Sequence, residues 1–135
     1  MLGFDRLDLH AHTAAHGAFA QARDLSVALP VVAWLVERGA ARLEGELAPH
    51  ATLGFARTSW STFAFSVTPR SHGAVYAGTV QLTTIAPGHT RLVVRGHIAH
   101  GANSDRARDR DAVETCVRSV LDRLTREIRD PKNAA

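Results

Sequence analysis

The clearest hydrophobic pattern in this sequence lies near its C-terminal end. Between Asp105 and Arg129, aliphatic residues recur at steps of three and four, which predicts an α-helix with one apolar face. The apolar positions are Val113, Val117, Val120, Leu121, Leu124 and Ile128. Charged residues fill the opposite side of this helix. The apolar face needs a surface to cover it, and the strand-rich middle of the chain is the candidate.

The N-terminal part of the sequence predicts one strand followed by one or two short helices. Residues alternate between apolar and polar from Phe4 to His12, which is the pattern of a half-buried strand. The small, alanine-rich stretch from Thr13 to Arg23 favours a short helix. The segment from Val27 to Val36 is apolar almost all round, so we expect a buried helix with Pro30 in its first turn and Gly39 as its stop.

The period of the pattern changes to two from Arg42 onward, where Leu43 and Leu47 face one way and Glu44 and Glu46 the other. Further strands are expected over Thr52–Thr68 (one long or two short), Val75–Ile85 and Arg91–His100, with turns at Ala48–His50, Pro69–Gly73 and Ala86–His89. The predicted fold class is α+β: a curved antiparallel sheet of five to seven strands that grips the long C-terminal helix.

Composition and charge indicate a single globular domain over residues 1–135. The formal net charge is +3, but the arginines alternate with acidic residues instead of clustering, so we do not expect a nucleic-acid partner. Cys116 is the only cysteine, which excludes an intrachain disulfide, and we expect it to be a small buried side chain.

The sequence predicts neither a secretory leader nor a membrane-spanning helix. The first residues lack a cationic start followed by an apolar run. The longest apolar run, from Val27 to Val36, contains Pro30 and is too short to cross a bilayer. The expected compartment is therefore the cytoplasm.

A possible metal motif lies near the N-terminus, where Asp8, His10 and His12 would share one face of a strand. This string resembles the opening of PHP phosphoesterases and amidohydrolases, whose His-x-His pair binds catalytic metal. Those enzymes need barrels of roughly 200 residues or more, which this chain cannot build. We therefore expect a polar outer strand face and no metal or other cofactor. If the first and last strands pair, these histidines would lie near Arg95 and His97.

The last half of the chain resembles the START-like (SRPBCC) helix-grip superfamily, which includes polyketide cyclases and lipid carriers. The resemblance rests on three stretches: Tyr76–Leu82, Pro87–Leu92 and the amphipathic segment Ala112–Leu124. It implies a cavity between the helix and the concave face of the sheet. The family usually has seven strands, whereas five or six can be counted here, and a shorter sheet implies a smaller or closed cavity.

The residues that would line this cavity follow from the resemblance and from strand parity. They are Trp34, Phe63, Phe65, Tyr76, Val80, Leu82, Val94 and Ile98. The alternative for each of them is ordinary core packing. Trp60 has the opposite parity, so we expect it at the surface or at a partner interface.

Besides the less favoured metal site on Asp8, His10 and His12, three functions remain open from the sequence. The first is binding of a small hydrophobic or amphipathic molecule without covalent chemistry. The second is a polyketide cyclase, aromatase or dehydratase activity on the same fold, with His100 or Tyr76 as proton-transfer groups. The third is a ligand-free interaction module, acting as a homodimer. A large cavity favours the first two functions, whereas a filled interior with an exposed apolar patch around Trp60 favours the third.

Overall fold

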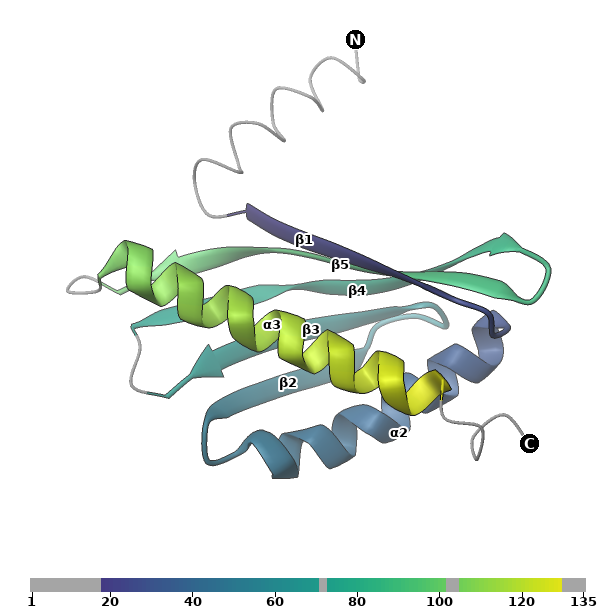
Figure 1. The fold of residues 1–135 in the computed structure, drawn as a ribbon, viewed down its shortest axis with the longest axis horizontal. Coiled ribbons are helices and arrows are strands. Elements are labelled where there is room, and N and C mark those ends of the chain that lie inside the picture. The colour runs from purple at the N-terminus through teal and green to yellow at the C-terminus, as the bar shows by residue number, and fades with distance from the viewer. Residues whose placement is uncertain (1–17, 71–72, 102–104, 130–135) are drawn as a thin grey trace, which may run out of the picture.

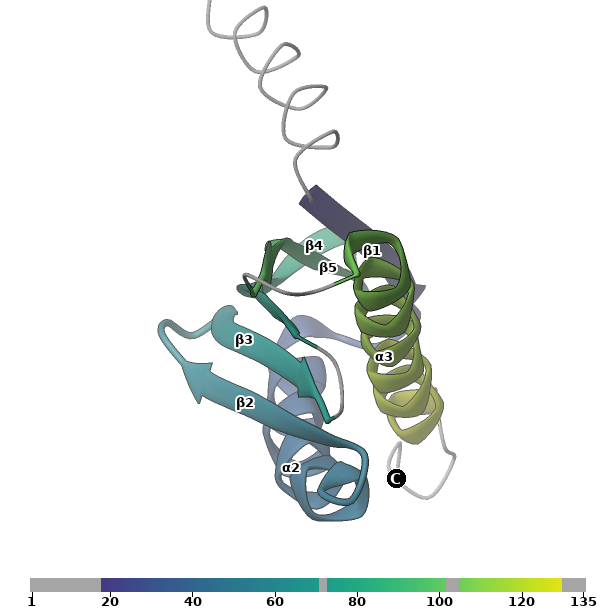
Figure 2. The same ribbon diagram turned by 90° about the vertical axis from the view of Figure 1, so that its left-hand side faces the viewer.

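The computed structural model describes residues 18–70, 73–101 and 105–129 of the chain. In this part, one curved sheet holds a long helix across its concave side, and a second helix packs beside the first (Figures 1 and 2). The elements in chain order are β1 (Ala18–Leu25), α2 (Leu29–Leu47), β2 (Ala51–Arg57), β3 (Thr62–Pro69), β4 (Ala74–Ala86), β5 (His89–His100) and α3 (Arg106–Arg129). Neither described helix has the length and apolar character that crossing a membrane requires.

The five described strands form one antiparallel sheet in the order β1-β5-β4-β3-β2. The predicted meander is confirmed from β2 to β5, and the segment Thr52–Thr68 resolves into two strands, β2 and β3. The predicted turn between β4 and β5 contains Gly88, whose positive φ of 73° favours glycine. The fold class predicted from the sequence is therefore confirmed.

Strand β1 corrects the helix predicted over Thr13–Arg23, because its described part, from Ala18 onward, is extended and pairs with β5. Phe19 points into the core, but Gln21 and Arg23 are only half-buried on that side. Small alanines occupy the outer side of the strand. The strand thus lacks the apolar alternation that would have marked it. The strand predicted over residues 4–12 lies outside the described residues.

Helix α2 corrects a second prediction, because it continues through Gly39 and ends at Leu47. Gly39 is buried where α2 meets α3, and a Cβ atom there would lie 3.0 Å from the Leu124 side chain. Close helix packing, not a helix stop, accounts for this glycine. Leu43 and Leu47 are four residues apart, which fits one turn of a helix as well as a strand. The position of Pro30 in the first turn is confirmed.

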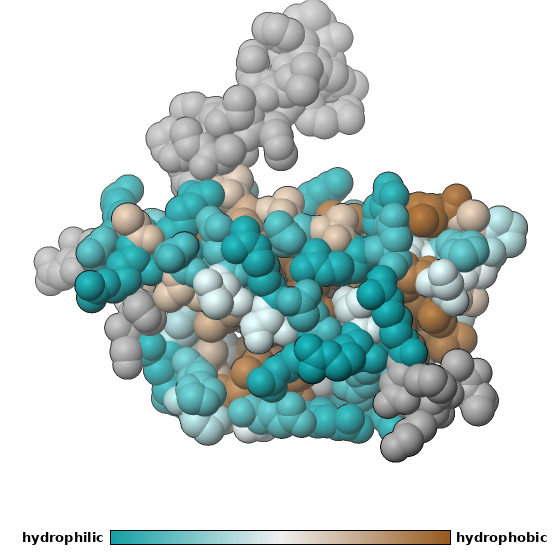
Figure 3. All heavy atoms as spheres, viewed as in Figure 1, coloured by the Kyte–Doolittle hydropathy of each residue, from teal (hydrophilic) through white to brown (hydrophobic). Residues whose placement is uncertain are grey.

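Helix α3 matches the prediction closely and supplies much of the core. Its predicted apolar residues are all buried, at 0–2% exposure. They pack with the inner face of the sheet and with α2 in a single hydrophobic cluster. The outward side of α3 is largely hydrophilic (Figure 3). The sheet, α2 and α3 therefore enclose one interior.

The contact at Gly39 gives a first prediction. A Gly39→Leu substitution should lower the free energy of unfolding by about 1–3 kcal/mol, because its side chain would overlap Leu124 and Glu127. Gly45 lies in the same helix with nothing within 4 Å, so Gly45→Leu should be neutral or stabilise by up to about 1 kcal/mol. Urea unfolding followed by circular dichroism measures both, and equal effects of the two substitutions would contradict the close packing.

Candidate functional site

The structure buries seven of the eight residues that the sequence placed around a cavity. Their exposed fractions are low: Phe63 1%, Phe65 3%, Tyr76 0%, Val80 0%, Leu82 3%, Val94 0% and Ile98 4%. All lie on the inner face of β3, β4 or β5, as strand parity predicted. The structure brings them together beneath α3, in the interior that the resemblance pointed to.

Aromatic rings form a row across the inner face of the sheet. From β1 towards β2, ring centroids lie 6.0 Å apart for Phe19–Tyr76, 5.9 Å for Tyr76–Phe65 and 4.9 Å for Phe65–Phe55. Phe63 contacts Phe55 at 6.5 Å and ends the row. Most of these pairs meet edge to face, an arrangement that stabilises aromatic clusters. We call these five rings the aromatic row.

A buried hydrogen bond holds Tyr76 in place within the aromatic row. Its hydroxyl donates a 2.7 Å hydrogen bond to the carbonyl oxygen of Phe19, so the ring reaches across β5 to β1. Gly96 makes room for this reach, because a Cβ atom there would lie 2.8 Å from the ring carbon Cζ of Tyr76. Burial raises the pKa of Tyr76 well above its ordinary value. The hydroxyl therefore stays protonated and is committed to the main chain.

Side chains fill the interior around these residues. Tyr76, Val80 and Val94 have no accessible area, and neither do Val113 and Val117 on the facing side of α3. A void large enough for water would leave accessible area on the side chains that line it. The open cavity implied by the resemblance is therefore not present around these side chains. A small or closed interior is what the short sheet implied.

Trp34 is the predicted lining residue that the structure places elsewhere. Its side chain is 54% exposed on α2, where the Arg38 guanidinium lies 5.2 Å from its ring centroid. The helix turns other residues, such as Val32, Leu35 and Val36, towards the core instead. The placement of Trp34 in the interior is thus wrong. Trp60 is 70% exposed in the β2–β3 turn, as its parity predicted.

A pocket of about 160 Å³ opens between α2 and β2 and reaches the end of the aromatic row. We call it the α2–β2 seam, and it is lined by Glu37, Ala40, Ala41, Glu44, Phe55, Ala56, Arg57 and Phe63. Its alanines leave room beside Phe55, which is only half-buried although it packs against the core. The pocket thus extends from the surface to Phe55 and Phe63 at the end of the aromatic row.

An ion pair spans the α2–β2 seam. The Arg57 guanidinium lies 3.0 Å from the Glu37 carboxylate across the two elements, and 5.2 Å from the ring centroid of Phe63. The same guanidinium donates a 3.4 Å hydrogen bond to the carbonyl oxygen of Trp60. Both side chains of the pair are partly exposed, so it contributes only about 0–1 kcal/mol to stability.

Helix α3 is held more firmly, chiefly by its buried apolar face, and partly exposed ion pairs flank it on both sides. On the β1 side, Arg23 binds Asp122 at 3.1 Å. On the α2 side, Arg42 binds Glu127 at 3.1 Å. Arg118 also covers the Phe19 ring at 5.2 Å. Together with its buried apolar face, these contacts make the helix a poor candidate for the moving part of a binding site.

The remaining sequence candidates offer little chemistry in the described part of the chain. His100 ends β5 half-buried, and its Nδ1 atom has no hydrogen-bond partner among the described residues. Cys116 is half-buried against the core, and burial raises the pKa of its thiol. Asp8, His10 and His12 lie outside the described residues. Within those residues, no group of three or more His, Cys, Asp or Glu could hold a metal.

Comparison with solved structures identifies the fold. The crystal structure of Ara h 8.0201 superposes with a TM-score of 0.56 at 9% identity, covering 82% of this chain and 96% of that one. The Zhui aromatase/cyclase from Streptomyces sp. R1128 gives 0.54 at 9% identity, with 82% and 90% covered. CalU16 from Micromonospora echinospora gives 0.57 at 13% identity, with 85% and 77% covered.

These similarities define the architecture of the protein: the chain has a helix-grip fold. The identities are too low to carry a function from any of these structures to this chain. No family model matches the sequence, and no curated protein is significantly similar to it. The likeness therefore establishes the fold that the sequence resemblance suggested.

The buried Tyr76 hydroxyl leads to a second prediction. Tyr76→Phe should lower the free energy of unfolding by about 1–2 kcal/mol at neutral pH, because the Phe19 carbonyl loses its buried donor. In the parent protein, stability should also fall above about pH 10, because the unfolded chain releases the phenol proton before the folded chain does. Unfolding curves across this pH range test both effects.

The substitution provides its own control for the pH effect. Tyr76 is the only tyrosine, so Tyr76→Phe should remove its contribution to the alkaline loss of stability. In native protein, the absorbance of tyrosinate should appear only as the chain unfolds. An ordinary tyrosine titration in folded protein would contradict the burial of this hydroxyl.

Proposed function

We propose that this chain binds a small hydrophobic or amphipathic molecule between its sheet and helices, and that the molecule enters through the α2–β2 seam. The observation that carries this proposal is the pocket whose lining joins half-buried Phe55 to Phe63 at the end of the aromatic row. Ligand sites are concave and lined mainly by apolar and aromatic side chains, with a few polar groups that set orientation. The seam combines three alanines and two phenylalanines with three charged side chains, Glu37, Glu44 and Arg57.

The size of the seam means that binding moves side chains. At about 160 Å³, the pocket is smaller than typical ligand sites of roughly 300–1,000 Å³. Phe55 is the side chain best placed to move, since it is half-buried and lies on the edge strand β2. Opening the seam breaks the exposed Arg57–Glu37 pair, whereas displacing α3 would uncover its whole apolar face. Opening the seam therefore costs less free energy than displacing α3.

The polar residues at the mouth of the seam suggest how an amphipathic ligand would lie. Glu37, Glu44 and Arg57 border the pocket, while its alanines and phenylalanines form the apolar part. The apolar end of the ligand would point towards Phe63, and a hydroxyl or carbonyl group would remain near Arg57. On binding, such a ligand would lose contacts with water and gain contacts with both the apolar and the charged side chains of the seam.

Binding without catalysis fits the interior better than a cyclase activity. A cyclase would need a proton-transfer group that faces the ligand. Of the two sequence candidates, Tyr76 already donates its hydroxyl proton to the Phe19 carbonyl. His100 lies at the end of β5 and does not line the seam.

A second candidate function, the interaction module, is favoured by two exposed tryptophans. Trp34 and Trp60 are 54% and 70% exposed, although tryptophan is usually well buried. Arg57 connects their surroundings, because it binds both Glu37 on α2 and the Trp60 carbonyl. A filled interior also agrees with this alternative. A dimer in sedimentation that Trp60→Ala dissociates, together with no binding at the seam, would favour it over ligand binding.

The test of the proposed function is a substitution that fills the seam. Ala41 is exposed and lines the pocket, so Ala41→Phe should fold normally and weaken binding of the neutral fluorescent probe N-phenyl-1-naphthylamine by about tenfold. Ala107 is an exposed helical alanine on α3 outside the pocket, and Ala107→Phe is the matched control. Equal affinities for the two variants would rule out the seam as the entry route.

A further inference from the structure

The free edge of β1 has an unusual arrangement of arginines. In the described sheet β1 pairs only with β5, so its other side is an edge. An edge strand normally presents unpaired N–H and C=O groups with which a strand of another chain can pair. Here the carbonyl of Ala22 accepts a 2.9 Å bond from Arg23, and that of Asp24 accepts a 2.8 Å bond from Arg129. Arginines thus occupy acceptors that a pairing strand would need.

The donors of the same edge are left facing outward. The N–H and C=O groups of one strand residue point to the same side, so the Asp24 N–H lies on this edge between the Ala22 and Asp24 carbonyls. Residues two apart in a strand are about 7 Å apart, which sets the spacing of the two arginine contacts. The Asp24 N–H is therefore flanked by the guanidiniums of Arg23 and Arg129. Three donor groups therefore follow one another along this stretch of the edge.

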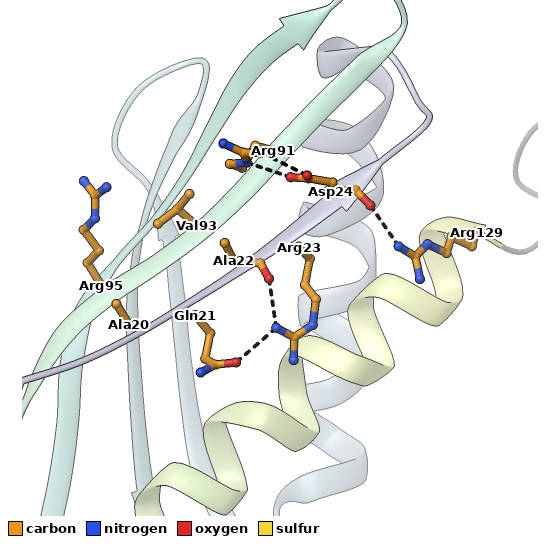
Figure 4. Close-up of a pocket in the computed structure, with 9 residues that line it drawn as sticks. All are labelled: Ala20, Gln21, Ala22, Arg23, Asp24, Arg91, Val93, Arg95 and Arg129. Atoms are coloured by element: carbon orange, nitrogen blue, oxygen red, sulfur yellow. Dashed lines mark hydrogen bonds and ion pairs between the residues drawn. The ribbon is translucent and has the colours of Figure 1, made fainter.

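Acidic groups do not cancel the charge of this edge. The Asp24 carboxylate is held on the other side of the strand by Arg91, with contacts of 2.7 Å and 3.0 Å (Figure 4). That hydrogen bonding keeps the pKa of Asp24 below its ordinary value. Asp122 balances Arg23 at 3.1 Å. Among the described residues, no carboxylate forms an ion pair with Arg95 or Arg129, so these two side chains leave the groove positive.

A groove of about 670 Å³ runs along this edge and gives a ligand room to bind. Its lining consists of Ala20, Gln21, Ala22, Arg23, Asp24, Arg91, Val93, Arg95 and Arg129 (Figure 4). The small alanines and Val93 provide an apolar surface beside the guanidiniums. The groove lies on the β1 side of α3, whereas the α2–β2 seam lies at the opposite edge of the sheet.

We propose that the groove binds the phosphate group of an organic phosphate ester, with its oxygens at the Asp24 N–H, Arg23 and Arg129. A tetrahedral oxyanion accepts bonds from several directions, and guanidiniums match its oxygens with two N–H groups each. The organic part of the ester would lie on the alanines and Val93. This site is independent of the proposed function in the interior.

The test uses phenyl phosphate as the probe and amide NMR as the readout. Adding it should move the Asp24 amide proton downfield beyond the change caused by sodium chloride at equal ionic strength. Arg129→Gln should weaken binding by about tenfold, since one charge-assisted contact is lost. Arg126→Gln removes an equal charge from an exposed position of α3 outside the groove, so it should keep nearly parental affinity.

Two further binding experiments identify the source of the phosphate group and define the results that would contradict the proposed site. Binding of phosphatidic acid vesicles in addition to phenyl phosphate would assign the phosphate to a lipid headgroup, and phenyl phosphate alone would assign it to a soluble ester. Asp24 amide shifts with phenyl phosphate that are no larger than those with sodium chloride would rule out the phosphate site. Equal losses in Arg129→Gln and Arg126→Gln, or binding of oligonucleotides without phenyl phosphate, would overturn it as well.

Discussion

The packing of α3 against the concave side of the sheet is the interaction on which the rest of the structure depends. Six aliphatic side chains of this helix are buried, a gain on the order of 10 kcal/mol before opposing terms. The sheet must curve and present apolar residues on one face only, and α2 must lie close enough to complete the enclosure. Gly39 permits that close approach. The same packing fills the interior and leaves the seam beside α2 as the less firmly held part.

The sequence predicts the elements whose burial follows a regular period. Helix α3 and strands β3 to β5 have one buried and one exposed face, so the positions of Val117, Phe65 and Val94 could be foreseen. Strand β1 could not, because its inward side carries the polar residues Gln21 and Arg23, which bind each other, and Arg23 also binds Asp122, which is distant in sequence. The second half of α2 was ambiguous because a spacing of four residues suits both a helix and a strand.

The candidate site was foreseen only in part. Strand parity correctly placed Phe63 and Tyr76 inside, but it gives no information about how a helix is rotated, and Trp34 was misplaced for that reason. Phe55 was missed, although it alternates with Leu53 on β2 and pairs with Phe65 on the same face. The arginine contacts at the β1 edge depend on tertiary approach between α3 and β1. Local sequence patterns do not encode such approaches.

The central claim is that an apolar ligand enters at the α2–β2 seam while α3 stays in place. Its most direct test is fluorine NMR of protein containing 4-fluorophenylalanine. The chain has five phenylalanines, so five signals can be assigned by single substitution. If an apolar ligand enters at the seam and displaces the end of the aromatic row, N-phenyl-1-naphthylamine should shift Phe55 and Phe63 strongly and Phe19 little. Shifts largest at Phe19, or none at Phe55 and Phe63 when the probe is bound, would contradict entry through the seam.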